Sequence, residues 1–249
     1  MTDELVHLDI DGPRATITLD SQHNRNALSR QLVAELFGAL QATERDPEVR
    51  VVLLRAAGTV FCSGADLSEA TADGMEEGAR RIVALQRYVV TMSKPVVVRL
   101  HGAVRAGGIG LVAAADVVIA DEDATFALTE VKLGLAAAII SLTVHARMNP
   151  RAAALTTLGG EKFGGRDAAA YGLVTEAVTA DVLDARVDEV CGQLATGAPQ
   201  GLRASKVILN RDLVARIDAH GEEMAALSAQ LFASDEARAA MTAFLNRKK

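Results

Sequence analysis

The stretch Phe61-Cys62-Ser63-Gly64-Ala65-Asp66-Leu67 decides the fold of this chain when it is considered with Ala106-Gly107-Gly108-Ile109-Gly110. Each stretch follows an apolar run typical of a buried strand, at residues 49–54 for the first and 96–100 for the second. Small residues after a strand let the chain turn sharply and leave backbone N–H groups accessible. If the two strands are neighbours, these N–H groups converge on one point and can stabilise an oxyanion that forms during a reaction.

The glycines of the second stretch have two other interpretations. They could be tight turns without a function, which the combination of both stretches makes less attractive. Residues 108–113 also fit the pattern G-x-G-x-x-A of a dinucleotide-binding turn, with Glu130 as the acidic residue beyond it. That pattern places its glycines directly after the strand, whereas residues 102–107 intervene here, and it leaves residues 61–67 unexplained.

Composition and charge limit the class of protein. The chain has 249 residues, 50% of them hydrophobic, which suits one large domain or a domain with a helical extension. Its net charge of −6 argues against nucleic acid as a partner. Cys62 and Cys191 show no pairing pattern, residues 1–4 do not resemble a signal peptide, and no apolar run reaches the ~18 residues of a membrane span. We therefore expect a cytoplasmic protein without a membrane partner.

The order of predicted elements indicates an α/β fold. Residues 5–19 alternate like a hairpin, and Ser29 can cap a helix that runs to about Glu44. Strands and helices then alternate to about residue 130, which implies a largely parallel sheet with crossover helices. Residues 66–78 resemble a mobile loop. Residues 1–180 are predicted to form the core domain and residues 181–249 a helical region, with helices at 182–194, 201–213, 217–232 and 235–245.

Several segments together resemble the enoyl-CoA hydratase/isomerase (crotonase) family. They stand in the family's order and span nearly the whole chain: Asn26-Ala27-Leu28, residues 61–67, Lys94-Pro95-Val96, Gly107-Gly108, residues 126–134 and Ala243-Phe244-Leu245. The resemblance implies a spiral of ββα units with a C-terminal helical region that trimerises, and a trimer or hexamer as the assembly. It also implies an acyl-CoA thioester as substrate, with no cofactor besides that substrate.

The resemblance assigns roles to particular positions. Ala65 and Gly107 would donate the two backbone N–H groups that hold a thioester enolate. The remaining residues of the expected substrate site are Ser63, Gly64, Asp66, Leu67, Gly108 and Gly110. A thioester carbonyl becomes an oxyanion when its α-proton leaves or when a nucleophile adds at the β-carbon. The small residues suffice because backbone donors need no side chain.

One of the two expected catalytic carboxylates is missing. Hydratases of this family use a glutamate three residues after the oxyanion glycine, where this chain has Gly110. The second family glutamate is retained as Glu130. A single carboxylate can hydrate or dehydrate through a bound water, can move a proton between carbons as an isomerase, or can belong to a protein that only binds acyl-CoA. We favour a hydratase or dehydratase with Glu130 as acid and base. A solvated surface role for Glu130 is the alternative.

Other residues are less informative. Arg105 could pair with a substrate carboxylate of glutaconyl type, or it could be a surface or interface arginine. Residues 136–138 are alanines where many family members have proline and glycine, so the wall of the acyl pocket is expected to differ. Cys62 is expected to be a small buried thiol and Lys206 a surface residue. The five histidines lack metal-ligand spacing, so no metal site is expected.

Overall fold

Two sheets form the centre of the protein in the computed structural model, which describes residues 4–66, 69 and 72–246. The larger sheet has the order β1-β2-β3-β5-β7-β10. Only the β1–β2 pair is antiparallel, as the hairpin pattern predicted, and the remaining pairs are parallel. The strands are β1 (Val6–Asp11), β2 (Arg14–Leu19), β3 (Val51–Ala56), β5 (Val96–Leu100), β7 (Val117–Asp121) and β10 (Glu176–Val178).

The smaller sheet carries the two turns of interest, and the sequence patterns did not reveal it. Its order is β4-β6-β8-β9, with β4 (Val60–Cys62), β6 (Ala103–Arg105), β8 (Thr125–Ala127) and β9 (Phe163–Gly164). The sequence analysis placed each turn after a long strand, as observed, but it did not predict a short strand between them. Each long strand is followed by a short strand of the second sheet, and the turn comes after that. Because β4 and β6 pair in parallel, both turns leave the same edge.

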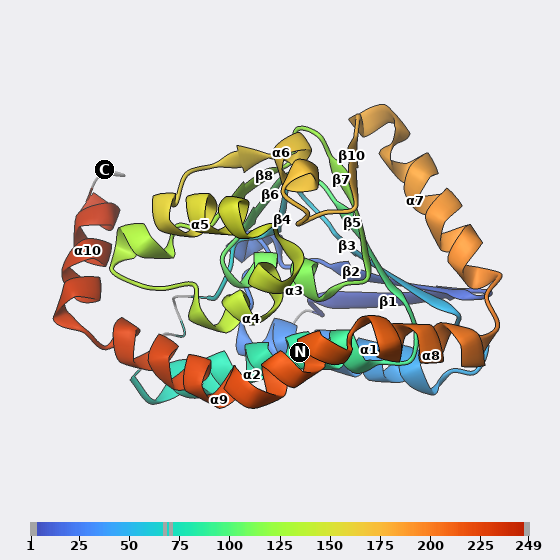
Figure 1. Ribbon diagram of the computed structural model, residues 1–249, viewed down its shortest axis with the longest axis horizontal. Coiled ribbons are helices and arrows are strands. Elements are labelled where there is room, and N and C mark those ends of the chain that lie inside the picture. Colours follow the sequence, from blue (N-terminus) through green and yellow to red (C-terminus); the bar gives the residue numbers. More distant parts are fainter. Residues whose placement is uncertain (1–3, 67–68, 70–71, 247–249) are drawn as a thin grey trace.

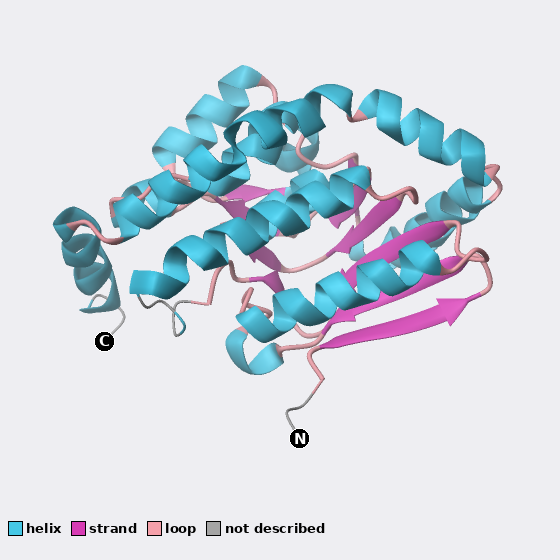
Figure 2. Cartoon of the chain, turned by 90° about the horizontal axis from the view of Figure 1, so that it is seen from below, coloured by secondary structure: helices cyan, strands magenta, loops and turns pink. Residues whose placement is uncertain are grey.

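Helices cover the sheets on both sides (Figures 1 and 2). Helix α1 (Arg30–Arg45) begins as predicted, because the Ser29 hydroxyl accepts a hydrogen bond from the Leu32 amide at 3.2 Å. The other helices before residue 180 are α2 (Ala72–Thr91), α3 (Gly107–Ala114), α4 (Ala138–Arg147), α5 (Pro150–Gly159) and α6 (Gly165–Ala170). Two short 3₁₀ turns are η1 (Gln22–Asn24) and η3 (Glu130–Leu133). The loop predicted for residues 66–78 is helical from Ala72 onward, and residues 67, 68, 70 and 71 lie outside the described residues.

The C-terminal region is helical, as the sequence indicated. It consists of α7 (Ala180–Ala195), α8 (Pro199–Leu209), α9 (Arg211–Phe232) and α10 (Asp235–Asn246). Helix α7 packs on the larger sheet, and α9 lies along α2 and α4. In Figure 1, α10 stands at the end of the molecule opposite α7, beside the segment that contains η3. In the part of the chain that the structure describes, no helix has the length and apolar character needed to cross a membrane.

Small and branched aliphatic residues fill the core, as expected for a chain with only 3% aromatic residues. Phe61 and Phe126 are its largest fully buried side chains, and they come from the two strands that flank β6. Cys62 is fully buried, as predicted, and this burial raises the pKa of its thiol to about 12. The thiol is therefore protonated and unreactive at neutral pH.

Lys206 corrects one prediction, because it is buried rather than at the surface, with 5% of the residue exposed. Its ammonium group lies 2.7 Å from the Asp116 carboxylate and donates to the carbonyl oxygens of Val89 and Lys94, each at 2.9 Å. The Val96 amide and the Asn210 side chain also donate to Asp116. Burial lowers the pKa of Lys206, and the Asp116 charge opposes that shift. The pair thus attaches α8 to the starts of β5 and β7 in the larger sheet.

We expect Lys206→Ala to lower the free energy of unfolding by about 3–5 kcal/mol, because it leaves the half-buried Asp116 carboxylate without the Lys206 cation. Denaturant unfolding followed by circular dichroism measures the change. Lys132→Met is the matched control, since Lys132 forms an exposed pair with Glu161 whose loss should cost less than about 1 kcal/mol. Equal effects of the two substitutions would contradict the assigned role of the buried pair.

Candidate active site

The two small-residue turns touch each other. Gly64 has φ +99°, and a Cβ atom placed on it would lie 2.9 Å from the Ala106 Cβ. Ala106 itself has φ +43°, a conformation that non-glycine residues rarely adopt. The structure thus places a strained residue directly before the first turn of α3, where strain often accompanies function.

The Ala65 backbone nitrogen lies close to Gly107 beside this contact. A Cβ placed on Gly107 would stand 3.9 Å from the Ala65 nitrogen and 3.0 Å from the Leu28 side chain. Gly107 is the first residue of α3, so its N–H has no carbonyl partner within the helix. Leu28 and Ala65 form an isolated bridge, in which the Leu28 amide donates to the Gly64 carbonyl at 2.8 Å. The structure therefore brings together the two residues that the sequence singled out as donors.

Gly108 and Gly110 lie on the buried side of α3. A Cβ on Gly108 would come within 2.8 Å of the Cys62 sulfur, so α3 can approach β4 only because this residue is glycine. A Cβ on Gly110 would stand 2.5 Å from the Ile140 Cγ2 and 3.0 Å from the Gln86 Oε1. Both glycines are explained by close packing. Their predicted part in substrate binding stays a prediction.

Gln86 and Thr143 lie beside Gly110, and no motif in the sequence pointed to either residue. Gln86 is 1% exposed, and its Oε1 accepts a hydrogen bond from the Thr143 hydroxyl at 2.7 Å. Its amide nitrogen donates to the Ile139 carbonyl at 3.3 Å. These contacts join α2 and α4 to Gly110 of α3, the position at which the family resemblance places the other glutamate. The space beside Gly110 is thus filled by protein and is not an open part of the site.

Glu130 is the first residue of η3, directly after the short strand β8 and its two-residue connection. Its carboxyl oxygen Oε2 is buried and has no hydrogen-bond partner among the described residues. Burial is the main influence on this carboxyl group and raises its pKa above the ordinary value of 4.5. A buried carboxyl oxygen without a protein partner is rare in folded proteins and is typical of a group that awaits a ligand or performs proton transfer. The surface role considered for Glu130 is therefore not what the structure shows.

A small pocket with a cavity volume of about 70 Å³ lies beside the Ala65 turn and opens to solvent. Its apolar walls come from α2, from the first turn of α4 and from the end of α9. Its lining includes Leu28, Ala65, Met75, Ile82, Ile139 and Phe232. Ile82 links this pocket to the second turn, because its Cδ1 lies 3.8 Å from a Cβ placed on Gly107.

The remaining predicted site residues lie around the first turn. The Ser63 amide and hydroxyl donate to the carbonyls of Arg25 and Asn24, each at 3.1 Å. The Asp66 carboxylate accepts a hydrogen bond from the Asn24 side chain at 2.9 Å and lines the pocket. Leu67 lies outside the described residues. Asn26, which the sequence analysis did not assign to the site, is 1% exposed and donates to the Ala57 and Val60 carbonyls, so it fixes the start of β4.

Arg105 lies on β6, just before the second turn. Its guanidinium donates to the Val104 carbonyl and to the carbonyl and hydroxyl of Thr125 on β8. Burial lowers the pKa of Arg105, which has no carboxylate partner among the described residues. These bonds account for its position as part of the smaller sheet, and its pairing with a substrate carboxylate stays a prediction. Among the described residues, no group of three histidine, cysteine or carboxylate side chains could hold a metal ion.

Fold and site together define an α/β protein in which the Ala65 and Gly107 turns meet beside an apolar pocket, with one buried carboxyl oxygen at Glu130. The sequence pattern of the enoyl-CoA hydratase/isomerase family matches residues 12–249, and the chain belongs to this family. The backbone is similar to a solved enoyl-CoA hydratase from Mycobacterium avium, with a TM-score of 0.93, 45% identity, and coverage of 99% of this chain and 98% of that one. This similarity covers nearly the whole chain and confirms the crotonase fold that the sequence resemblance implied.

Curated relatives carry different activities in their names. A Thermus thermophilus protein provisionally named enoyl-CoA hydratase is 35% identical over 80% of this chain and 81% of its own length. The peroxisomal Δ(3,5)-Δ(2,4)-dienoyl-CoA isomerase of Arabidopsis thaliana is 26% identical over 99% of this chain and 95% of its own. The relatives thus support acyl-CoA chemistry in general and include both water addition and double-bond movement.

Proposed function

We propose that this protein is an enoyl-CoA hydratase or dehydratase in which Glu130 is the only catalytic carboxylate. The observation that carries the proposal is the buried Glu130 Oε2, which has no hydrogen-bond partner among the described residues. Burial raises the pKa of this carboxyl group, which makes it a stronger base, and the same group can return the proton that it accepts. The names of the hydratase relatives support water addition as the reaction.

The proposed reaction uses the two backbone amides and the carboxylate in sequence. Glu130 accepts a proton from a water molecule, whose oxygen adds to the β-carbon of the enoyl thioester. The displaced π-electrons move to the thioester oxygen and form an enolate, which the N–H groups of Ala65 and Gly107 stabilise. Glu130 then delivers its proton to the α-carbon, so that one water has been added and the carboxylate is restored. Each donor is expected to contribute on the order of 2.7–4 kcal/mol to transition-state stabilisation.

A second candidate function is isomerisation of the double bond. The absence of a carboxylate at Gly110 favours it, because Ile140 and Gln86 occupy the place from which a second acid or base would act. In that reaction Glu130 removes a proton from one carbon and returns it to another, and the same two amides hold the dienolate. Binding of acyl-CoA without turnover is the third possibility, and the buried Glu130 Oε2, which has no partner among the described residues, argues against it.

The decisive experiment is incubation of the protein with a panel of enoyl-CoA thioesters in heavy water, followed by mass spectrometry. A product heavier by one water, formed at a constant rate per enzyme, supports the hydratase. Double-bond movement or deuterium incorporation without water addition would overturn it in favour of an isomerase. Tight thioester binding with no change in any member of the panel would mean that the site only binds.

The proposed role of Glu130 predicts an unusual pH dependence. The carboxylate form acts as the base, so kcat/KM should fall as the pH drops through the pKa of Glu130. Because burial raises this pKa, the midpoint of the fall should lie above 4.5. Initial rates between pH 4 and pH 9, with stability checked at each pH, measure it. A midpoint at or below 4.5 would contradict the assignment.

We also propose that copies of this chain associate, as the family resemblance implied. Large apolar side chains are exposed on α5 and α8, among them Leu158 at 74% and Leu209 at 79%. Exposed apolar groups of this size are typical of surfaces that bind another protein. Sedimentation velocity over a range of concentrations would distinguish a monomer from a trimer or hexamer.

A further inference from the structure

The turn that carries Glu130 has little structure of its own. Within η3, the Gly134 and Leu135 amides both donate to the Glu130 carbonyl, and Thr129 provides no side-chain cap. A single 3₁₀ turn with these few bonds is marginal by itself. The position of the Glu130 carboxyl group must therefore be set by what packs against the turn.

Two small residues enclose the turn from opposite sides. On one side is Gly160, the αL residue that ends α5, where an added Cβ would lie 3.0 Å from Val131 and 3.1 Å from Lys132. On the other side is α10, whose residue Ala237 is completely buried. A Cβ added to Gly134 would lie 3.2 Å from the Ala237 Cα, so the backbones of η3 and α10 are already in close contact.

The first turn of α10 is held in place by the corner that joins it to α9. The Ser234 hydroxyl accepts a hydrogen bond from the Ala237 amide at 3.1 Å and donates to the Leu231 carbonyl at 2.7 Å. Phe232, at the end of α9, lines the pocket beside Ala65. The α9–α10 corner thus touches the proposed acyl pocket and the catalytic turn at once.

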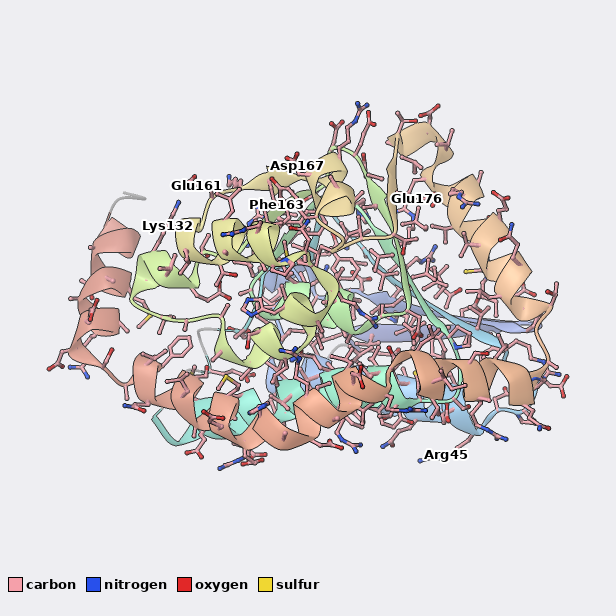
Figure 3. All side chains as sticks on the ribbon, viewed as in Figure 1. Arg45, Lys132, Glu161, Phe163, Asp167 and Glu176 are labelled. Atoms are coloured by element: carbon pink, nitrogen blue, oxygen red, sulfur yellow. The ribbon has the colours of Figure 1, made fainter. Side chains whose placement is uncertain are left out.

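The α5 side is fixed less firmly. Figure 3 shows Lys132 and Glu161 at the outer edge of the molecule, where their charged groups lie 2.7 Å apart. Both side chains are largely exposed, so this ion pair contributes little. The buried contact of Ala237 with Gly134 is therefore the stronger restraint on η3.

We infer that Ala237 is a positioning residue, which sets the place of the Glu130 carboxyl group from the C-terminal helix. The inference rests on the function proposed above. A larger side chain at position 237 has no free space, because Ala237 is completely buried and its backbone already contacts Gly134, so the substitution is expected to shift α10 against η3. A displacement of about 1 Å at a catalytic group can cost on the order of 100-fold in rate. Substrate binding through the Ala65 turn would be affected much less.

The test compares Ala237→Leu with Ala239→Leu, which makes the same change on an exposed position of the same helix. We expect Ala237→Leu to lower kcat by roughly 10- to 100-fold, with KM within about threefold of the wild-type value. We also expect the acid limb of its pH profile to move, because the burial that raises the Glu130 pKa changes. Ala239→Leu should leave kcat, KM and the pH profile unchanged. Circular dichroism and thermal unfolding establish whether both variants are folded. If Ala237→Leu does not fold, Ala237→Val, a milder change at the same position, replaces it in the test.

A double variant separates this inference from the proposed function. If Ala237 acts through Glu130, Ala237→Leu combined with Glu130→Gln should be no slower than Glu130→Gln alone. Independent, multiplying losses in the double variant would overturn the inference, as would an unchanged kcat and pH profile in folded Ala237→Leu. If Glu130→Gln alone keeps wild-type activity, the proposed function fails, whatever Ala237→Leu does.

Discussion

Glu130→Gln is expected to lower kcat for the enoyl-CoA substrate by roughly 10²–10⁴-fold, which is the usual contribution of general acid–base catalysis. The amide has nearly the same size as the carboxylate, yet it can neither accept the proton of the attacking water nor return it to the α-carbon. KM should change little, because the proposed substrate contacts involve the Ala65 and Gly107 turns. Steady-state kinetics over the wild-type range of substrate concentrations measures both parameters.

The same substitution should leave the protein at least as stable as before. Burial raises the pKa of Glu130, which means that the folded protein disfavours the charged form. Removal of that charge is therefore expected to keep or raise the melting temperature. Glu48→Gln, at an exposed position after α1, is the matched control and should change neither rate nor stability. A fully active Glu130→Gln variant would show that another group moves the proton.

Gly110→Glu is expected to destabilise the fold by at least about 3 kcal/mol rather than create a second catalytic carboxylate. Its Cβ would stand 2.5 Å from the Ile140 Cγ2, and its carboxylate would be forced among buried side chains of α2 and α4. The midpoint of denaturant unfolding measures the loss. The rate per folded molecule should not exceed that of the wild-type protein.

Gly38→Glu provides the control for Gly110→Glu. Gly38 lies within α1, and a Cβ placed there meets nothing within 4 Å, so this variant should be as stable as the wild type or slightly more so. The combination of Gly110→Glu with Ile140→Ala should recover part of the lost stability, because it removes the atoms that clash. If Gly110→Glu is stable by itself and hydrates faster, then α4 can move, and the packing around Gly110 does not determine the number of catalytic carboxylates.

Local signals in the sequence were sufficient where the structure is local. Alternating apolar residues predicted the β1–β2 hairpin, and Ser29 marked the start of α1, because strand pairing across a short turn and a helix cap depend on neighbouring residues. The helical character of the C-terminal region followed from its periodicity. The short strands β4 and β6 were missed because three residues are too few to show a period. Lys206 was misplaced because its partner Asp116 lies 90 positions earlier in the chain.

The sequence by itself determined the family and the presence of Glu130 at the position of one family glutamate, and it predicted Ala65 and Gly107 as the two donor positions. These features depend on residue types in a fixed order, which the chain carries directly. Only the tertiary structure showed that Gly64 and Ala106 meet, that the Glu130 Oε2 is buried without a protein partner, and that Ile140 fills the space beside Gly110. It also placed Ala237 against the catalytic turn, although more than a hundred residues separate the two. Contacts between distant segments arise when helices and sheets pack around a common core, and no local pattern records them.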